Sequence, residues 1–437
     1  MTVFGNLIEK GDNVVRKRIF ILLILMALVF SSCAKKIKKD TDQKTASPVT
    51  LVFATFLDDG EQVEAYRDII KNFEDKNKDI KVDLVFGGTG YYQKISDAFV
   101  NNKKVDIVGL KRNKMIEYAK MGYIKDLTQW VDKNDFKDKY YGVNLGYGKL
   151  NAKYYGIGDL PYTNEWFYNV DLFEKYGIGQ PGTLDEFIDT CKTLKKYVKD
   201  PIAAGTKDPW VANILFGMIS VQTVNTDELS NAFADNDREA FLSLSGAQDA
   251  VNTYYDLKKA GSANYKANNY DYSTSVDNFV NGKAAIFPMG SWAIDKIEKV
   301  KSQEFKYDVF ENAINFAQNP ISKVAATAVQ VITVNQKTKH INEVMKFMDF
   351  LFSEESQSIF AEKNGISGLK TVNKADTPVK KNIIDHLNQT DENSTMYIDN
   401  ISDAMMNVTA DRLSQMMSGK IKIEDTWNII AQESSVK

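Results

Sequence analysis

The sequence has few of the side chains from which metal sites and catalytic triads are built. Its 437 residues include two cysteines, Cys33 and Cys191, and two histidines, His340 and His386. Neither histidine lies at a spacing typical of zinc ligands, and a triad that uses histidine has almost no material. We therefore expect no bound metal, no cofactor and no catalytic residue, and any catalysis would have to rest on carboxylates.

An excess of charge of either sign is also missing. The chain has 55 Lys and Arg residues against 58 Asp and Glu residues, which gives a net charge of −3 at pH 7. A nucleic-acid partner requires a basic face, so this balance argues against nucleic-acid binding. The hydrophobic fraction of 43% is ordinary for a globular protein with a core.

The main apolar run lies near the N-terminus. Basic residues 16–18 precede the apolar stretch 19–30, which is followed by Ser31, Ser32 and Cys33. A run of about twelve residues is too short to span a bilayer as a mature anchor, and this order is typical of a lipoprotein export signal. We expect residues 1–33 to be the signal and Cys33 to carry lipid at the cell membrane, outside the cytoplasm. The alternative is a short transmembrane anchor with an incidental cysteine.

The residues after the signal are polar. Residues 34–48 offer almost nothing to bury, so we expect a flexible tether. The folded part then begins near Val49 and is long enough for two or more domains with their own cores. With Cys33 lipidated, Cys191 has no intramolecular partner, and we expect it to pack on a helix.

Short β-rich runs alternate with helical patterns in the first part of the folded chain. Residues 50–56 precede a helical pattern at 61–74, residues 80–86 precede one at 91–101, and 105–108 opens another unit. Such alternation predicts an α/β fold with a parallel sheet covered by helices. Ligands bind at the carboxyl ends of strands in such sheets, so the candidates there are Phe56, Asp58, Tyr91, Tyr92, Lys111 and Arg112.

Strands and helices continue in the second part. Residues 159–169 predict a strand that leads into a helix at 171–176, and Thr183 with Glu186 resembles a capping box that starts a helix through Leu194. Further predictions are a helix that ends with 276–280, strands at 284–288 and 325–334, and helical structure at 341–364.

Four stretches of the chain resemble the family 1 extracellular solute-binding proteins, the maltose-binding-protein-like receptors that deliver sugars to ATP-binding cassette importers. They are residues 51–73, 166–187, 279–292 and 354–368, in the family's order, and the likeness spans about 48–437. The resemblance implies a periplasmic-binding-protein type II-like fold, with two α/β lobes joined by hinge strands and a sugar in the interlobe cleft. It also implies a binding protein and no enzyme.

The resemblance also implies where the lobes divide. The chain should cross between them near Leu160, Val324 and Leu369. The first lobe would comprise 48–160 plus 325–368, and the second 161–324 plus 369–437. Clefts between domains are favoured ligand sites, and hinge closure buries the ligand.

Aromatic and planar polar side chains are the candidates for sugar contacts, because rings stack on the C–H faces of sugars and amides or acids bind their hydroxyls. The resemblance places the turn of Gly290 and Ser291 at the cleft, with Trp292 behind it, and Trp210 at the second lobe's stacking position. Residues along the extended hinge segment alternate sides, so some of the following should face the cleft: Tyr162, Asn164, Glu165 and Trp166. Packing in the core is the alternative for each aromatic residue.

Lys111 and Arg112 can be interpreted in two ways. They form either a solvated surface pair or, if one of them faces the cleft, a site for an acidic or hydroxyl-rich sugar held by charge-assisted hydrogen bonds. The sequence does not decide between the two.

These features together predict a monomeric, extracytoplasmic, lipid-anchored receptor. It would bind a sugar or oligosaccharide and deliver it to the permease subunits of an ATP-binding cassette importer. Three alternatives stay open: the same fold with a peptide, polyamine or metal ligand, a sugar sensor for a membrane kinase, and a surface carbohydrate-active enzyme with paired carboxylates. No catalytic motif supports the last of these.

Overall fold

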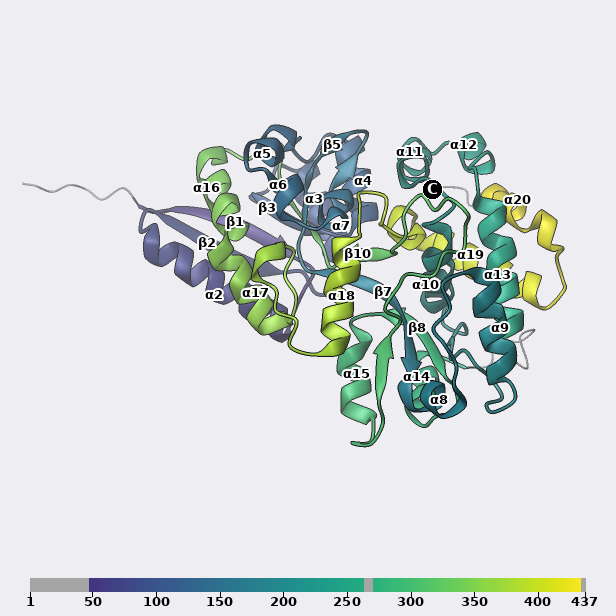
Figure 1. Cartoon of the computed structure of the whole chain (residues 1–437). Helices are drawn as coiled ribbons and strands as arrows, with labels where there is room; N and C mark the ends of the chain where they lie inside the picture. The colour runs from purple at the N-terminus through teal and green to yellow at the C-terminus, as the bar shows by residue number, and fades with distance from the viewer. Residues whose placement is uncertain (1–46, 263–269, 434–437) are drawn as a thin grey trace, which may run out of the picture. The chain divides into compact units, whose positions relative to one another are not determined.

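The computed structural model describes residues 47–262 and 270–433 (Figure 1). The chain divides at Pro48, and Val49–Lys437 forms one compact unit. The predicted export signal, Cys33 and all but the end of the tether lie outside the described residues. None of the helices in the described ranges has both the length and the apolar character needed to span a bilayer.

One sheet contains the first three predicted strands. Its order is β2-β1-β3-β11-β6, and the strands are β1 (Val49–Thr55), β2 (Ile80–Phe86), β3 (Ile107–Leu110), β6 (Gly156–Gly158) and β11 (Val331–Val334). Strand β1 pairs in parallel with β2 and β3, as predicted. Strand β11 runs antiparallel to β3 and β6, so the prediction of a parallel sheet holds for half of the sheet only.

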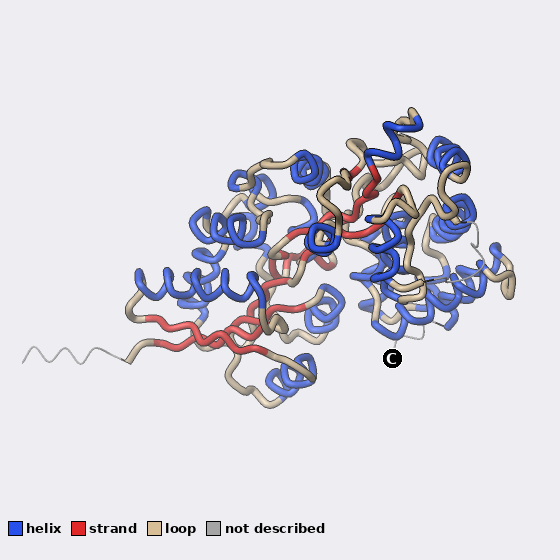
Figure 2. The backbone as a smooth tube through the Cα atoms, turned by 90° about the horizontal axis from the view of Figure 1, so that it is seen from below, coloured by secondary structure: helices blue, strands red, loops and turns tan. Residues whose placement is uncertain are grey.

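Helices cover both faces of this sheet, and Figure 2 shows its strands between helices. The alternation of side chains along β1 explains the arrangement, because Phe53 faces one side and Ala54 the other. Phe53 packs with Tyr66 of α2 (Gly60–Lys76) at a ring distance of 5.3 Å, and with Phe347 of α16 (Ile341–Leu351) at 6.2 Å. Ala54 belongs to the cluster that includes α3 (Tyr91–Val100) and α4 (Arg112–Lys120).

A second sheet is built around the long strand β7 (Pro161–Asn169). Its partners are β8 (Ile286–Gly290), β9 (Tyr307–Val309) and β10 (Ala326–Ala328), and all three pairings are antiparallel. The predicted single strand at 325–334 is therefore wrong. It is two strands, of which β10 joins the second sheet and β11 the first, and the chain crosses between the sheets at Val329 and Gln330.

Local signals placed several helices of this part correctly. Helix α8 (Val170–Tyr176) follows β7, and α9 (Leu184–Leu194) begins after Thr183, whose Oγ1 accepts a hydrogen bond from the Glu186 amide at 3.3 Å. The capping box is only half formed, because the Glu186 carboxylate accepts from the Gly182 amide at 2.8 Å. Cys191 is buried on α9 as predicted, and burial raises its pKa to about 12.

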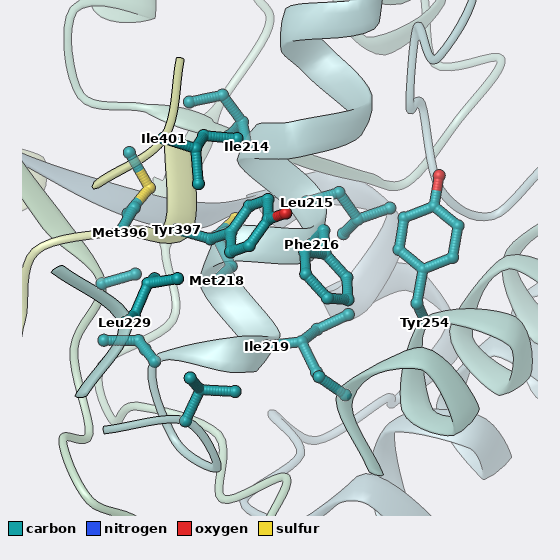
Figure 3. Close-up of a cluster of buried hydrophobic side chains, with 14 of the residues drawn as sticks. Ile214, Leu215, Phe216, Met218, Ile219, Leu229, Tyr254, Met396, Tyr397 and Ile401 are labelled. Atoms are coloured by element: carbon teal, nitrogen blue, oxygen red, sulfur yellow. The ribbon is translucent and has the colours of Figure 1, made fainter. Parts of the chain in front are cut away.

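The remaining helices pack against the sheets or against one another. Helix α10 (Pro209–Ser220) is buried on almost every side and contacts the chain's last helices, with Phe216 and Tyr397 rings 5.1 Å apart (Figure 3). Helices that follow α10 in the chain include α11 (Thr226–Asp235), α12 (Arg238–Leu242), α13 (Ala247–Gly261), α14 (Tyr272–Val280), α15 (Ala293–Val300), α18 (Pro378–Asn388), η2 (Tyr397–Asn400), α19 (Asp403–Met417) and α20 (Ile423–Glu433). Strands β4 (Lys149–Leu150) and β5 (Lys153–Tyr154) form a separate antiparallel pair, and the other helices are α5 (Thr128–Lys133), α6 (Phe136–Lys139), α7 (Gly142–Tyr147), α17 (Glu354–Asn364) and η1 (Lys370–Val372).

A buried carboxylate holds the two crossing segments together. Asp159, between β6 and β7, accepts hydrogen bonds from the Tyr66 hydroxyl at 2.7 Å and from the Gln330 amide at 3.0 Å. Burial raises the pKa of Asp159 to about 6, although these hydrogen bonds oppose the shift. Asp159 therefore links the segment between β6 and β7 and the segment between β10 and β11 to helix α2, which packs on the first sheet.

Candidate functional site

Trp292 stands at the end of β8, where the chain turns into α15. Gly290 pairs with Asn164 across the sheet, and Ser291 and Trp292 form the turn. The indole lies directly over Gly290, since a Cβ atom at position 290 would be 2.0 Å from the ring's Cζ3. Trp292 is half-buried, and its ring is perpendicular to that of Tyr162 at 5.6 Å. Packing against the backbone therefore fixes the orientation of the indole.

A pocket of about 330 Å³ lies on one side of Trp292. Trp210 lines it from the first turn of α10, where Pro209 starts the helix, and packs against Tyr272 at 5.1 Å. Asp403 at the start of α19 and Lys111 at the end of β3 contribute exposed charges. Further lining residues are Arg112, Asn113, Tyr147, Ile214, Thr327, Ala328, Val329, Met396, Ile398, Asp399, Ile401, Ser402 and Met406.

A buried acid lies in the wall of this pocket. Asp399 accepts a hydrogen bond from Thr327 Oγ1 at 3.1 Å and a longer one from the Tyr147 hydroxyl at 3.5 Å. Burial raises the pKa of Asp399 to about 7, and the nearby guanidinium of Arg112 acts against that shift. The pocket thus combines two indole rings with groups that bind hydroxyls or cations.

Arg112 is a buried part of the pocket wall. Its side chain is 1% exposed, so the interpretation as a solvated surface residue is wrong for Arg112. The guanidinium donates to Asn400 Oδ1 at 2.8 Å and to three backbone carbonyls, those of Gly146 at 2.6 Å, Tyr147 at 3.1 Å and Lys149 at 2.7 Å. Burial lowers its pKa to about 10. Lys111, its neighbour, is exposed.

Trp292 also lines a larger cavity of about 530 Å³. Pro161, Tyr162 and Ser291 line it near the indole, and the Tyr162 hydroxyl accepts a hydrogen bond from Gln62 Nε2 of α2 at 3.1 Å. The rest of the wall comes from α15, β9, the end of α17 and the start of α18. Trp292 therefore lines two cavities in the described part of the chain.

The sequence of the chain matches a known protein family. Residues 59–358 match the model of the family described as bacterial extracellular solute-binding protein. The chain belongs to this family.

Relatives and solved structures agree with that assignment. The chain is similar to the multiple sugar-binding protein of Streptococcus mutans serotype c, with 22% identity over 78% of this chain and 79% of that protein. It also resembles the melibiose/raffinose/stachyose-binding protein MelE of Bacillus subtilis strain 168, with 28% identity over 43% of this chain and 42% of that protein. A probable secreted solute-binding lipoprotein from Streptomyces coelicolor has the same fold, with a TM-score of 0.71 and 17% identity over 89% of this chain and 99% of that one.

Several predictions from sequence are confirmed by these findings. The resemblance to family 1 solute-binding proteins is correct, and the solute-binding protein has the expected two-lobe α/β fold with a cleft between the lobes. The family and the relatives are binding proteins, so the chain is a binding protein and not an enzyme.

Two predicted hinge residues of the solute-binding protein have internal roles. Glu165 forms an ion pair with His386 at 2.9 Å, and both side chains are 4% exposed. Trp166 packs against Phe187 at 4.7 Å and Phe316 at 5.7 Å. Both line a small space of about 30 Å³ and neither lines a cavity beside Trp292, so their prediction as cleft residues is not supported.

Asn164 borders the same small space. Its side chain is 6% exposed, and neither its oxygen nor its nitrogen has a hydrogen-bond partner among the described residues. Of the four hinge candidates, Tyr162 lines the cavity of about 530 Å³, and the other three line the small space.

Three other candidates, Phe56, Tyr91 and Tyr92, form a separate aromatic group in this solute-binding protein. The Tyr91 hydroxyl donates to the carbonyls of Ala54 at 3.1 Å and Gly109 at 2.9 Å, so Tyr91 braces two strands. Phe56 contacts the rings of Tyr91 at 6.1 Å and Tyr92 at 6.3 Å. Asp58 is exposed. Among the described residues, these four do not line either cavity beside Trp292.

The sequence did not predict the pocket residues that lie between Met396 and Met406. Ile398 and Met406 have the apolar spacing of ordinary packing residues, and Asp399 has no local pattern that marks it. A partial signal was available at Ser402, which caps α19 by accepting from the Met405 amide at 3.2 Å. Asp403 directly follows this cap, so the predicted start of a helix would have indicated Asp403 as a candidate.

Proposed function

We propose that the protein is an extracellular receptor, lipid-anchored through Cys33, that binds a carbohydrate between its lobes and delivers it to the permease subunits of an ATP-binding cassette importer. It acts as a monomer. The observation that carries this proposal is the placement of Trp210 and Trp292 in the wall of one pocket, beside the charged groups of Lys111, Asp399 and Asp403.

The chemistry of that pocket suits a sugar. Indole rings offer apolar faces to sugar C–H groups, and carboxylates and ammonium groups bind hydroxyls. The names of the relatives support the same ligand class, since the Streptococcus and Bacillus proteins are named for sugars. Neither observation favours a peptide, a polyamine or a metal.

The boundaries of the proposed lobes lie near the places where the chain passes from one sheet to the other. We assign 48–160 plus 325–368 to the first lobe and 161–324 plus 369–437 to the second. The change from β6 to β7 at Leu160 supports the first boundary, since the two strands belong to different sheets. Strand β10 pairs with β7, which favours moving the second boundary from Val324 to Val329 and Gln330.

Ligand titration tests the binding step. Trp292→Ala and Trp210→Ala should each weaken binding of the sugar that the wild type prefers among melibiose, raffinose and arabino-oligosaccharides. Loss of a buried aromatic anchor costs about 2 kcal/mol or more, which is roughly a 30-fold change in Kd. Tyr197→Ala is the matched control, because Tyr197 is 46% exposed and stacks on Tyr176 away from the pocket. Binding of none of the sugars would contradict the ligand assignment.

The anchor and the importer require separate tests. Cys33→Ala should abolish acylation, which mass spectrometry of the mature protein detects as loss of the lipid mass on the N-terminal residue. Deleting the gene should abolish uptake of the bound sugar by whole cells. Normal uptake without the protein, together with loss of a transcriptional response to the sugar, would favour the sensor over the transport receptor.

A further inference from the structure

The end of the first sheet opposite the chain crossings carries a groove lined with lysines. The groove has a volume of about 440 Å³, and its lining includes Lys103, Lys104, Lys337 and Lys339. All four side chains are exposed. The first two follow α3, and the other two lie between β11 and α16. We call it the lysine groove, and in the described part of the chain it shares no lining residue with the two cavities beside Trp292.

The charge of the lysine groove is not neutralised by the acids around it. Asp106 is the acidic residue among its described lining residues, and its side chain is 3% exposed. The Asp106 Oδ1 accepts a hydrogen bond from Thr338 Oγ1 at 2.6 Å, and its Oδ2 accepts one from the Val52 amide at 2.9 Å, so both oxygens hold the fold together. Lys103 pairs with Asp97 at the surface. The other three lysines of the groove form no ion pair with any described residue.

The lysine groove lies close to the place where the folded unit begins. The Asp106 amide donates to the Val52 carbonyl at 2.9 Å, and Val52 is about 10 Å along β1 from Val49, the first residue of that strand. The other end of β1 lies at a crossing, because Thr55 Oγ1 donates to Gln330 Oε1 at 2.9 Å. In Figure 1 the start of β1 is at the end of the first sheet away from β7.

This position places the lysine groove beside the attachment point of the predicted tether. Residues 34–48 connect Cys33 to the folded unit. A chain of that length spans at most about 50 Å when it is fully extended. With Cys33 lipidated, as proposed, β1 starts within that distance of the membrane. The attachment raises the effective concentration of the groove at the membrane, so weak contacts are enough for docking.

Phosphate groups at a membrane surface suit the lysine groove. Lysine ammonium groups bind phosphate as point charges, and each basic residue close to an anionic membrane increases the partition coefficient about fivefold. The net charge of the chain is −3, so an anionic surface repels the chain as a whole. Attraction therefore requires a local basic face, and the lysine groove provides one next to the tether.

We propose that the lysine groove is a docking surface for the headgroups of anionic phospholipids in the membrane that holds the tether. The inference rests on the proposed anchor at Cys33 and goes beyond it, because it assigns a second, electrostatic membrane contact to the folded part. Asp106 precedes β3 and Lys111 follows it, so docking at the groove leaves the pocket with Lys111 at the far end of the strand.

Co-sedimentation with lipid vesicles tests the docking surface without the lipid anchor. The chain from Ala34 to Lys437 contains every described residue and lacks Cys33. Phosphatidylcholine vesicles with about 30% phosphatidylglycerol supply an anionic surface, and pure phosphatidylcholine vesicles supply a neutral one. We expect binding to the anionic vesicles to be about tenfold tighter or more, and the difference to disappear at about 0.5 M salt, where charges are screened.

A triple variant, Lys104→Gln with Lys337→Gln and Lys339→Gln, removes the unpaired charges of the groove. Three lysines that contribute about fivefold each predict a loss of about 100-fold in binding to the anionic vesicles. The three side chains are exposed, so the variant should keep its fold, which thermal unfolding checks. Its affinity for sugar should equal that of the wild type.

The matched control is a second triple variant, Lys196→Gln with Lys199→Gln and Lys420→Gln. These lysines are also exposed, and they lie after α9 and between α19 and α20. The control changes the net charge by the same amount as the groove variant. We expect it to change vesicle binding by less than about threefold, because exposed charges far from the docked face are screened.

The outcomes decide the assignment of the lysine groove. Equal binding to anionic and neutral vesicles, or equal losses in the groove variant and its control, overturns the docking surface. Calorimetric binding of inorganic phosphate that disappears in the groove variant, without binding to vesicles, assigns the groove to a free anion and also overturns it. None of these results affects the sugar receptor or the lipid on Cys33, because sugar titration and mass spectrometry measure those separately.

Discussion

The indole of Trp292 occupies the place where a side chain at position 290 would begin. The distance of 2.0 Å between a Cβ atom there and the ring's Cζ3 is far below any real contact. Residue 290 must therefore be glycine for the indole to stand between the two cavities. The position of the Trp292 indole therefore depends on the glycine two residues before it.

Gly290→Ala should displace the indole and weaken sugar binding. We expect a loss of tenfold or more in affinity and a lower Tm, since overpacking costs about 1–3 kcal/mol. Calorimetry and thermal unfolding measure the two effects. Gly179→Ala is the control, because a Cβ atom at Gly179 meets nothing within 4 Å and the backbone there needs no left-handed conformation. Unchanged affinity in Gly290→Ala would show that the indole tolerates displacement.

The buried pair of Glu165 and His386 should make stability depend on pH. Burial by itself lowers the pKa of His386, but the Glu165 carboxylate outweighs burial and raises it to about 9. The unfolded chain has a histidine pKa near 6.5. The pair's contribution is therefore fully present below about pH 6.5 and is lost as the pH rises through 9, by at most about 3 kcal/mol.

Urea unfolding at several pH values measures this effect. Stability of the wild type should fall between pH 6.5 and pH 9, and the double variant Glu165→Gln with His386→Gln should show a flatter profile. His386→Ala alone should be strongly destabilised, because it leaves a buried charge unpaired, at a cost of about 3–5 kcal/mol. His340 is not paired in this way and lies at the start of α16, so His340→Gln serves as the control. An identical pH profile in the double variant and the wild type would contradict the assignment.

Tyr66→Phe should lower the free energy of unfolding, because it removes a hydrogen bond to Asp159 in one of the crossing segments. The Tyr66 hydroxyl donates to Asp159 at 2.7 Å, and hydrogen bonds to charged groups are worth about 1.5–3 kcal/mol. Tyr140→Phe removes a buried hydroxyl that donates to the neutral carbonyl of Phe352 at 2.8 Å, so it should cost about 1 kcal/mol. Denaturant unfolding compares the two. A Tyr66→Phe variant no less stable than Tyr140→Phe would show that Asp159 is held well enough by backbone amides alone.

Arg112→Lys should destabilise the pocket wall although it keeps the charge. A lysine ammonium is a compact donor and cannot reach the Asn400 side chain and three carbonyls as the planar guanidinium does. We expect a loss of about 3 kcal/mol and weaker sugar binding. Arg67→Lys is the control, because Arg67 forms an exposed pair with Glu64 and such pairs contribute little. Equal stability of both variants would contradict a supporting role for Arg112.

Local sequence patterns predicted which residues form helices and strands better than they predicted which sheet each strand joins. Strand β1, helix α2 and the cap at Thr183 follow from spacing and side-chain chemistry within a few residues. The run 325–334 also has strand character throughout, but nothing local decides which sheet each half joins. That choice depends on pairing partners such as Leu110 and Tyr162, which lie far away in the sequence.

The candidate site shows the same limit. Trp292 and Trp210 were found because a resemblance placed them, and their packing agrees with a pocket. Lys111 and Arg112 are neighbours with the same charge, yet one is exposed and the other is buried beneath the pocket. Burial of Arg112 follows from carbonyls of α7 and β4 and from Asn400, and no pattern around residue 112 encodes those partners.

The crossing at Val329 and Gln330 sets how the two sheets can turn relative to each other. Both residues of this link and the neighbouring pair Asp159 and Leu160 are flanked directly by paired strands, so the torsion of a closing motion must fall on a handful of backbone dihedral angles. Gln330 also donates from its side chain to the Tyr66 hydroxyl at 3.1 Å, which couples its rotation to the helix beside it. We therefore expect these short links to limit any rotation of the two sheets relative to each other.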